Sequence, residues 1–422
     1  MLAHPLTQTA QRLLQEGQAG QASATLWHML QTEQGLDRAW LDCVVQLVIC
    51  LDGAGFRPQA QHWLALAAPV GRRLGLMLRE PLPMPAHLAP EVFDQAQLKT
   101  LKRYPALEDP QSYIYVIEIA GNCNLRCPSC PVGNMPEEPR ARGLMPLTLF
   151  EQILDKIAQD RPDTPIVIHL FNWGEPLLHP QLHRFVHAIR ARRWRSIVST
   201  TLNIDRGLPE LVQAAPDVLK VSMSGWTQQD YGSTHVRGQV DKVKANLRQL
   251  RSLMDQAPPA DRAGMHAGMQ VGMQVVVGYH LYKHNSAGAQ QARAFAASLG
   301  FAYMENNAVL MPVERNLDVL AGRADALTQD IVSRLPIHPV EVARINRSRR
   351  SGQFDCELRF NMTAIDADGS VALCCGTYSR HLRLHPSFVQ ASRQELEEAK
   401  YRSTFCKECM GSGLAYTVND IL

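Results

Sequence analysis

Residues 113–130 read "YIYVIEIAGNCNLRCPSC" and join a short apolar run to a loop with three cysteines. The run is rich in β-branched and aromatic residues, which is typical of a buried strand. Cys123, Cys127 and Cys130 then follow with the spacing C-x3-C-x2-C. Three thiolates are one fewer than the four ligands of a closed structural zinc site. Either a fourth ligand lies elsewhere in the chain, or the open position itself has a function.

More strand-like runs follow the first one, and helical patterns separate them. The runs cover residues 165–171, 195–201, 218–224, 269–277 and 301–310. Residues 147–159 predict one of the helices, with Thr148 and Glu151 as a capping box at its start. Six alternating strand and helix patterns predict an α/β fold, a parallel sheet with helices outside. Such sheets carry functional residues at the C-terminal ends of their strands, where the cysteine loop would lie.

Residues 1–105 predict a helical N-terminal domain, because their leucines show no strand-like alternation. The segments around Trp27 and Trp63 look alike and fit a diverged helical-hairpin repeat, although a simple helical bundle fits equally well. Cys43 and Cys50 are seven positions apart on one helix face, so we expect them to be buried apolar residues. The proline-rich residues 79–90 predict a linker.

Composition narrows the class of protein. The 422 residues suffice for two or three domains with their own cores. A net charge of +3, with 45% hydrophobic and 20% charged residues, argues against a nucleic-acid-binding or membrane protein. The N-terminus lacks a signal-peptide pattern, so we expect a cytoplasmic protein. Ten cysteines in that reducing compartment favour metal ligands or reactive thiols over disulfides.

The cysteine triplet, in the loop after the first strand of a parallel barrel, resembles the radical S-adenosylmethionine (SAM) superfamily over residues 110–318. Thiolates suit iron–sulfur clusters, and three of them can hold a four-iron cluster with one iron open. The resemblance implies a partial (β/α)6 barrel, with a [4Fe–4S] cluster on the three cysteines and SAM bound to the open iron. It also implies that reductive cleavage of SAM yields a 5′-deoxyadenosyl radical, which takes hydrogen from a substrate carbon.

Loops after later strands carry residues that resemble the SAM contacts of this family. Residues 171–180, "FNWGEPLLHP", resemble its Gly-Gly-Glu stretch, with Trp173 in place of the first glycine. Gly174 would let the backbone approach SAM, and Glu175 would accept a hydrogen bond from the SAM ammonium. By the same resemblance, further SAM contacts would come from Asn203, Ser222 and Arg237.

One position departs from the family pattern. Ser129 stands just before the third cysteine, where the family often has an aromatic residue near the adenine. The adenine would then be held by other residues, for example by the fifth or sixth strand. Structural zinc remains the alternative interpretation of the triplet.

The last region, residues 351–422, follows a helical connector at 319–350 and holds five more cysteines. Residues 360–375 predict a hairpin whose turn, 366–369, ends in Gly369, a residue that allows a positive φ. The spacing C-x12-G-x4-C…C-x2-C resembles the twitch domain, the shortened form of the SPASM domain. The resemblance implies a second, auxiliary [4Fe–4S] cluster on four thiolates: Cys356, Cys374, Cys406 and Cys409. A zinc ribbon would use the same four ligands.

Cys374 and Cys375 are adjacent, and neighbouring side chains of a strand point to opposite faces. Only one of them is therefore expected to reach the auxiliary cluster, and the spacing from the glycine selects Cys374. Cys375 is then either a buried bystander or a donor of a hydrogen atom to a substrate radical, which would resemble radical SAM epimerases.

The resemblance leaves the substrate open. We favour a peptide, which would be epimerised, or oxidised and cross-linked, because helical-hairpin arrays present extended binding surfaces. A sugar or aminocyclitol dehydrogenase or epimerase is the alternative enzyme. A non-catalytic iron–sulfur or zinc scaffold with a partner-docking helical domain is an alternative of another class. An enzyme of this family would take its electrons from a flavodoxin- or ferredoxin-type donor.

Overall fold

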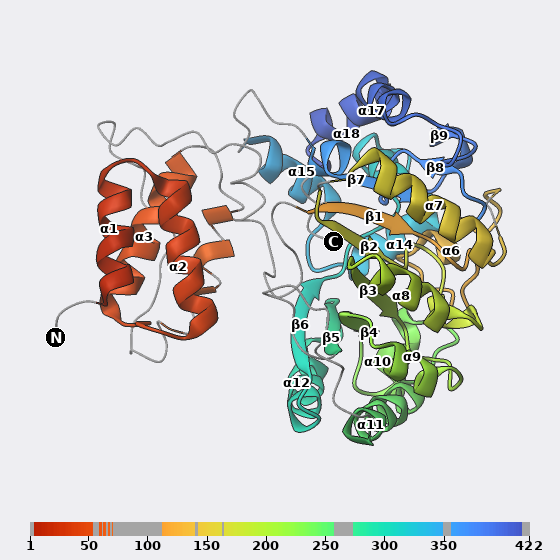
Figure 1. Ribbon diagram of the computed structural model, residues 1–422, viewed down its shortest axis with the longest axis horizontal. Helices are drawn as coiled ribbons and strands as arrows, with labels where there is room; N and C mark the ends of the chain where they lie inside the picture. Colours follow the sequence, from red (N-terminus) through yellow and green to blue (C-terminus); the bar gives the residue numbers. More distant parts are fainter. Residues whose placement is uncertain are drawn as a thin grey trace. The chain divides into compact units, whose positions relative to one another are not determined.

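The structure is a computed structural model, drawn in Figure 1. It describes residues 4–53, 59–60, 62–64, 66–67, 70, 112–139, 142–162, 164–256, 273–348 and 356–415. The predicted linker at 79–90 and the first part of the predicted fifth strand lie outside these residues. Contacts divide the chain into two compact units, Met1–Gln111 with Ser348–Phe354, and Ser112–Arg347 with Asp355–Leu422.

The first unit is built from helices packed on an apolar core. Its long helices in the described residues are α1 (Pro5–Gln15), α2 (Ala19–Thr32) and α3 (Arg38–Gly53). Trp40 is fully buried in this core, Cys43 is buried beside it, and Cys50 is half-buried. The two cysteines therefore pack as apolar residues, as the sequence predicts. Trp27 and Trp63 meet edge to face, with ring centres 5.9 Å apart.

The second unit is organised around one sheet with the strand order β6-β5-β4-β3-β2-β1-β7-β8-β9 (Figure 1). The strands are β1 (Tyr113–Ile117), β2 (Ile166–His169), β3 (Arg195–Thr200), β4 (Val218–Met223), β5 (Gln274–Leu281), β6 (Ala302–Asn307), β7 (Met362–Ile365), β8 (Val371–Ala372) and β9 (Arg383–His385). Every pair from β6 through β1 to β7 is parallel. The six strands expected from the sequence are thus present and parallel, in consecutive order.

The predicted C-terminal hairpin is also part of this sheet. Its first strand, β7, pairs in parallel with β1, and β8 then pairs with β7 in the antiparallel sense. All four residues of β7 are buried, so other elements pack on both faces of this strand. Gly369 in the turn has a φ of +80° and donates its N–H to the Asp366 carbonyl at 2.8 Å. The predicted turn is confirmed.

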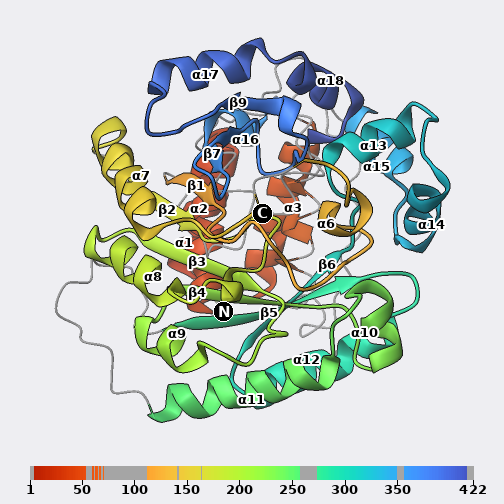
Figure 2. The ribbon, with the colours of Figure 1, turned by 90° about the vertical axis from the view of Figure 1, so that its right-hand side faces the viewer.

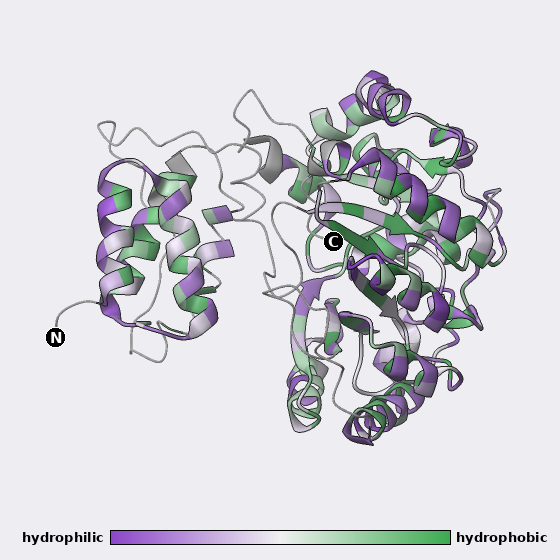
Figure 3. Cartoon of the chain, viewed as in Figure 1, coloured by the Kyte–Doolittle hydropathy of each residue, from purple (hydrophilic) through white to green (hydrophobic). Residues whose placement is uncertain are grey.

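Helices cover the outer face of the parallel strands, as Figure 2 shows for α7, α8, α9, α11 and α12. The helices of this unit are α6 (Pro131–Asn134), α7 (Leu147–Asp160), α8 (Leu182–Ala191), α9 (Leu208–Ala214), α10 (Gln228–Thr234), α11 (Val240–Gln256), α12 (Ala289–Ser298), α13 (Val313–Leu320), α14 (Ala326–Arg334), α15 (Pro339–Ser348), α16 (Glu357–Phe360), α17 (Arg393–Arg402) and α18 (Thr404–Ser412). Phe150 of α7 and Phe185 of α8 lie fully buried against each other, with ring centres 4.6 Å apart. Figure 3 shows the resulting pattern, apolar strands under helices that are polar outside.

The capping box predicted at the start of α7 is wrong. The helix begins at Leu147 with Pro146 at the N-cap position, and no side chain caps it. Thr148 therefore lies inside the first turn rather than before it. Glu151 instead forms an ion pair with Arg192 of the following helical segment, at 2.8 Å.

Parallel pairing brings the C-terminal ends of β1 to β6 to one edge of the sheet. The loops that follow these strands carry the cysteine triplet and the predicted SAM contacts, so the fold gathers them at that edge. Among the described residues, no helix has the length and apolar character needed to cross a membrane.

Candidate functional site

The loop after β1 carries Cys123, Cys127 and Cys130 and is held by its own backbone. Cys130 donates its N–H to the Cys127 carbonyl at 3.0 Å, and the short helix α6 begins at the next residue. The buried Asn134 side chain donates to the carbonyls of Pro128 and Met311, both at 2.8 Å. These bonds connect the cysteine loop to the segment that follows β6.

Burial raises the pKa of all three thiols. The pKa of Cys123 is raised to about 11 and that of Cys130 to about 12, and the pKa of Cys127 is raised well above its usual value. The pKa of Cys127 is raised further by the charges of the other two thiolates, because the three sulfur groups are neighbours. Three clustered thiols fit a cationic iron–sulfur cluster, since positive charge is what stabilises buried thiolates.

Gly174 lies in direct contact with the backbone of the cysteine loop. A Cβ atom at this position would be 1.7 Å from the Ala120 carbonyl oxygen and 2.9 Å from that of Asn122. The next residue, Glu175, donates its N–H to the Asn122 carbonyl at 2.8 Å. Only glycine allows the loop after β2 to lie this close to the loop after β1.

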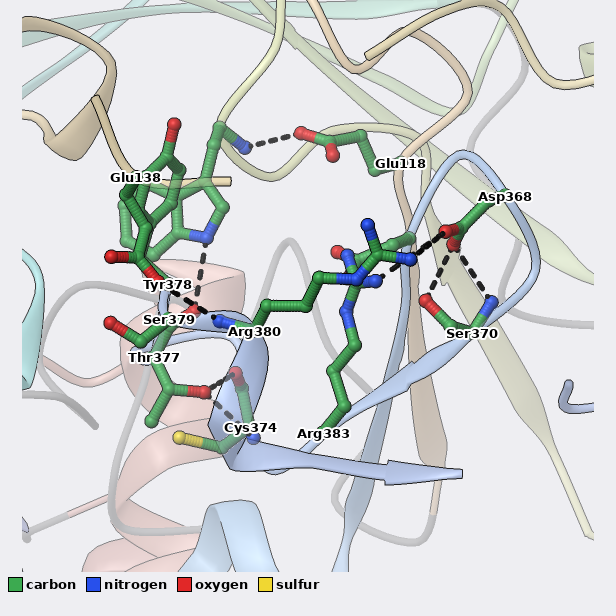
Figure 4. A network of polar contacts seen from close by, with 12 residues as sticks. Glu118, Glu138, Asp368, Ser370, Cys374, Thr377, Tyr378, Ser379, Arg380 and Arg383 are labelled. Carbon is green, nitrogen blue, oxygen red and sulfur yellow. Dashed lines mark hydrogen bonds and ion pairs between the residues drawn. The ribbon is translucent and has the colours of Figure 1, made fainter. Parts of the chain in front are cut away.

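Glu118, which no sequence motif singled out, organises this contact. Its carboxylate is buried and accepts from the backbone N–H groups of Trp173, at 2.9 Å, and Gly174, at 2.7 Å. Figure 4 shows the Glu118 side chain with a hydrogen bond to its carboxylate. A single acidic residue in the apolar run 113–120 was the signal that could have identified it, because a buried carboxylate needs specific donors.

Glu175 is engaged by the protein through both carboxylate oxygens. One oxygen accepts from the Leu177 N–H at 3.0 Å and the Thr200 hydroxyl at 2.7 Å. The other accepts from the N–H and the hydroxyl of Thr201, both at 2.8 Å. Burial raises the pKa of this carboxyl, while the four donors lower it. The geometry therefore gives Glu175 the role of joining the ends of β2 and β3, and its contact with SAM stays a prediction.

Asn203 is similarly held within the loop after β3. Its side-chain amide donates to the Tyr231 hydroxyl at 2.5 Å, and its carbonyl oxygen accepts from the Gln239 N–H at 2.7 Å. Asn203 thus connects β3 with α10 and the start of α11. A direct contact between Asn203 and SAM also stays a prediction.

Arg237 has an exposed side chain on a strained backbone. Its φ is +74°, a left-handed value that residues other than glycine rarely adopt. The strain is held by neighbours: Gly238 donates to the His235 carbonyl at 2.8 Å, and Val236 accepts from the N–H of Arg126 at 3.0 Å. Arg126 belongs to the cysteine loop, so Arg237 is held next to that loop. Backbone strain of this kind is common at functional sites.

Two other predicted positions lie at the same edge. Ser222 is half-buried in β4, and its hydroxyl makes no hydrogen bond with the described residues. Ser129 donates to or accepts from the hydroxyl of Tyr282 at 2.6 Å. Tyr282 follows β5 directly and is buried, which raises its pKa. An aromatic side chain from the fifth strand thus reaches the position where the family pattern is not met.

The second group of cysteines lines a separate pocket. Cys356, Cys374, Cys406 and Cys409 share it with Arg359. The other lining residues are apolar: Val313, Leu358, Leu373, Phe405, Met410 and Ala415. Burial, followed by the neighbouring Cys375, Cys356 and Cys409, raises the pKa of Cys374 well above its usual value. The four predicted ligands thus lie around one apolar cavity, and this donor set fits an iron–sulfur cluster.

The strand geometry assumed for Cys374 and Cys375 is wrong. β8 ends at Ala372, and the two cysteines lie in the turn that follows. Cys375 nevertheless does not line the pocket of the other four cysteines. It is buried in an apolar cluster with Ile114 and Val116 of β1.

Among the residues that the structure describes, no three His, Cys, Asp or Glu side chains are grouped so that they could hold one metal ion.

Comparison with known proteins gave matches only among solved structures. No family model and no curated protein matched the chain. BtrN in complex with AdoMet and 2-DOIA is 15% identical over 73% of this chain and 90% of that chain, with a TM-score of 0.38. anSMEcpe with bound AdoMet is 14% identical over 72% and 84%, with a TM-score of 0.41. Streptococcus suis SuiB bound to S-adenosylmethionine is 11% identical over 85% and 84%, with a TM-score of 0.45. These three are radical SAM enzymes, the superfamily that the cysteine motif resembles.

Replacing Gly174 tests the close contact between the two loops. In Gly174→Ala the Cβ would overlap the Ala120 carbonyl, so the backbone must shift. We expect SAM affinity to fall at least about tenfold, which corresponds to roughly 1.4 kcal/mol. Equilibrium binding of SAM to the reconstituted protein measures this. The matched control is Gly232→Ala, whose Cβ would meet only the flexible Gln228 side chain; equal affinities for both variants would contradict the assignment.

Proposed function

We propose that this protein is a radical SAM enzyme of the cytoplasm with one auxiliary iron–sulfur cluster. The observation that carries the proposal is the position of Cys123, Cys127 and Cys130. Their loop lies at the C-terminal edge of a parallel sheet, in backbone contact with the loop of Gly174. Three clustered thiols leave one iron of a four-iron cluster open to a small ligand. When bound, this cluster supplies the electron that cleaves SAM to a 5′-deoxyadenosyl radical.

The surrounding residues suit the parts of SAM. The exposed guanidinium of Arg237 can bind a carboxylate bidentately, and the strained backbone holds it beside the cysteine loop. The hydroxyl of Ser222 is available to a ribose hydroxyl. Position 129 has no aromatic side chain to pack on the adenine. Tyr282, whose hydroxyl is hydrogen-bonded to Ser129, offers its aromatic ring instead. Gly174 lets the loop after β2 lie directly against the cysteine loop, where SAM would bind.

The four-cysteine pocket is proposed as the auxiliary site. Four thiols in an apolar cavity would bind all four irons of a cluster, so no iron would be open to SAM. This cluster would therefore store or transfer electrons. A zinc ion is the alternative occupant of the same ligands, but it is less favoured because no three of the described His, Cys, Asp or Glu side chains are grouped to hold one metal ion.

A peptide is the proposed substrate, with epimerisation or oxidative cross-linking as the outcome. The support is the helical N-terminal unit, since helical hairpins present extended surfaces to peptides. A small sugar or aminocyclitol substrate remains the alternative. The test measures product formation from a candidate precursor peptide and from an aminocyclitol, each with SAM and a flavodoxin-type donor. The compound that is turned over decides between the two substrate proposals.

Anaerobic reconstitution tests the metal sites. The wild-type chain is expected to take up about eight irons and, once reduced, to form 5′-deoxyadenosine from SAM. Replacing Cys123, Cys127 and Cys130 by Ala should leave about four irons and abolish cleavage. Replacing Cys356, Cys406 and Cys409 by Ala should also leave about four irons but preserve cleavage in the absence of substrate.

The paired variant Cys43→Ala/Cys50→Ala is the control, because these cysteines pack in the helical unit. It should retain the full iron content and full cleavage. Zinc in place of iron, with no formation of 5′-deoxyadenosine, would contradict the proposed function.

The role of Cys375 has its own test. As a hydrogen-atom donor, its thiol would transfer H to the substrate carbon radical, and the remaining thiyl would need one electron from the external donor and one proton from solvent. Cys375→Ala should then cleave SAM at the wild-type rate but lose at least about 90% of product formation, a tenfold loss of the kind expected when a reacting group is removed. In D2O the wild-type product should carry deuterium. Full product formation by Cys375→Ala would make this residue a packing residue only.

A further inference from the structure

Trp173 stands where the related Gly-Gly-Glu stretch has its first glycine, and the proposed function gives that side chain no role. Its backbone belongs to the cofactor loop, because its N–H and that of Gly174 both bond to the buried Glu118 carboxylate. Glu118 is itself tied to β7 through its N–H, which donates to the Ile365 carbonyl at 2.8 Å. The main chain at Trp173 is therefore fixed at the C-terminal end of β1.

The Trp173 side chain reaches the other cysteine site. Its indole N–H donates to the Thr377 carbonyl at 3.2 Å, and its ring meets Tyr378 edge to face at 6.0 Å. Thr377 in turn bonds to Cys374: its hydroxyl donates to the Cys374 carbonyl at 3.0 Å. Figure 4 shows Cys374, Thr377 and Tyr378 in this order along the turn. The Trp173 side chain thus connects the loop of Gly174 to the turn that carries Cys374, one of the predicted auxiliary ligands.

The far side of that turn is held by α13. The Glu314 carboxylate accepts from the N–H groups of Tyr378, at 2.8 Å, and Ser379, at 2.9 Å. Val313 donates its N–H to the Gly376 carbonyl at 2.9 Å. Glu118 therefore fixes the N–H groups of Trp173 and Gly174. Glu314 fixes those of Tyr378 and Ser379, in the turn that the indole reaches. Both segments that the Trp173 side chain connects are therefore fixed by buried carboxylates.

We propose that Trp173 is a positioning residue that couples the SAM site to the auxiliary cysteine site. This inference rests on the proposed function and adds a linkage between its two sites. Occupation of the four-cysteine pocket orders the turn at Cys374, and Trp173 passes that order to the peptide at Gly174, where SAM is expected to bind. By thermodynamic reciprocity, SAM binding stabilises the auxiliary site to the same extent.

A double-mutant cycle on SAM affinity measures the coupling. The dissociation constant of SAM is determined for the reconstituted wild type, for Cys406→Ala/Cys409→Ala, for Trp173→Gly and for the combined variant. In the wild-type background, loss of the auxiliary ligands should weaken SAM binding at least about fivefold, the lower end of typical allosteric couplings. In the Trp173→Gly background the same loss should change it less than about twofold. Equal effects in both backgrounds, or none in either, would overturn the inference.

Two further variants sharpen the cycle. Trp173→Phe keeps an aromatic ring against Tyr378 but removes the indole donor to Thr377, so it should retain only part of the coupling. Trp194→Phe is the matched control, since Trp194 packs against the helix-covered core just before β3. It should leave the coupling unchanged.

Hydrogen exchange tests the link without SAM or iron. In the cluster-free protein, the amides of residues 374–380 should exchange faster in Trp173→Gly than in the wild type or in Trp194→Phe. If the wild-type protein binds no SAM, the proposed function is refuted. If residues 374–380 also exchange at the same rate in Trp173→Gly as in the wild type, the link is refuted as well. Faster exchange without coupling in the affinity cycle would also overturn the positioning role, because Trp173 would then only stabilise the turn.

Discussion

The site depends on one close contact, that of Gly174 with the backbone after β1. The Ala120 carbonyl occupies the space that any side chain at position 174 would need. Because nothing separates the two backbones, the Glu175 N–H reaches the Asn122 carbonyl, and the loop after β2 lies directly against the cysteine loop. The cysteine triplet and Gly174, on which the proposed cofactor site depends, lie on this pair of loops.

Buried carboxylates then hold the loops in place. Glu118, Glu175 and Glu314 each accept from successive backbone N–H groups or from hydroxyls of neighbouring loops. A carboxylate is suited to this task since its two oxygens can accept several donors at once. Burial raises the pKa of Glu175 and Glu314, while the hydrogen bonds that they accept lower it. These carboxylates hold the loops together at the edge of the sheet where SAM cleavage is proposed to occur.

Much of this arrangement could be predicted from the sequence. The six parallel strands follow from short β-branched runs between helical patterns, a signal that survives without homologues. The turn at Gly369 follows from local chain chemistry, as does the buried character of Cys43. Predictions that needed exact boundaries failed: α7 starts one residue before Thr148 rather than after it, and β8 ends before Cys374. Element ends are set by a few competing hydrogen bonds, so pattern alone places them poorly.

The spacing of the cysteines is local, and it limited the proposed occupant of each group to an iron–sulfur cluster or zinc. No local sequence pattern predicts the contacts between residues that are far apart in the chain. The parallel pairing of β7 with β1, the bond between Ser129 and Tyr282, and the reach of Trp173 to Thr377 are all of this kind. They arise because buried strands and buried polar groups must find partners wherever the folded chain brings them. Which cysteines share a pocket, and which residue joins the two sites, are therefore consequences of packing.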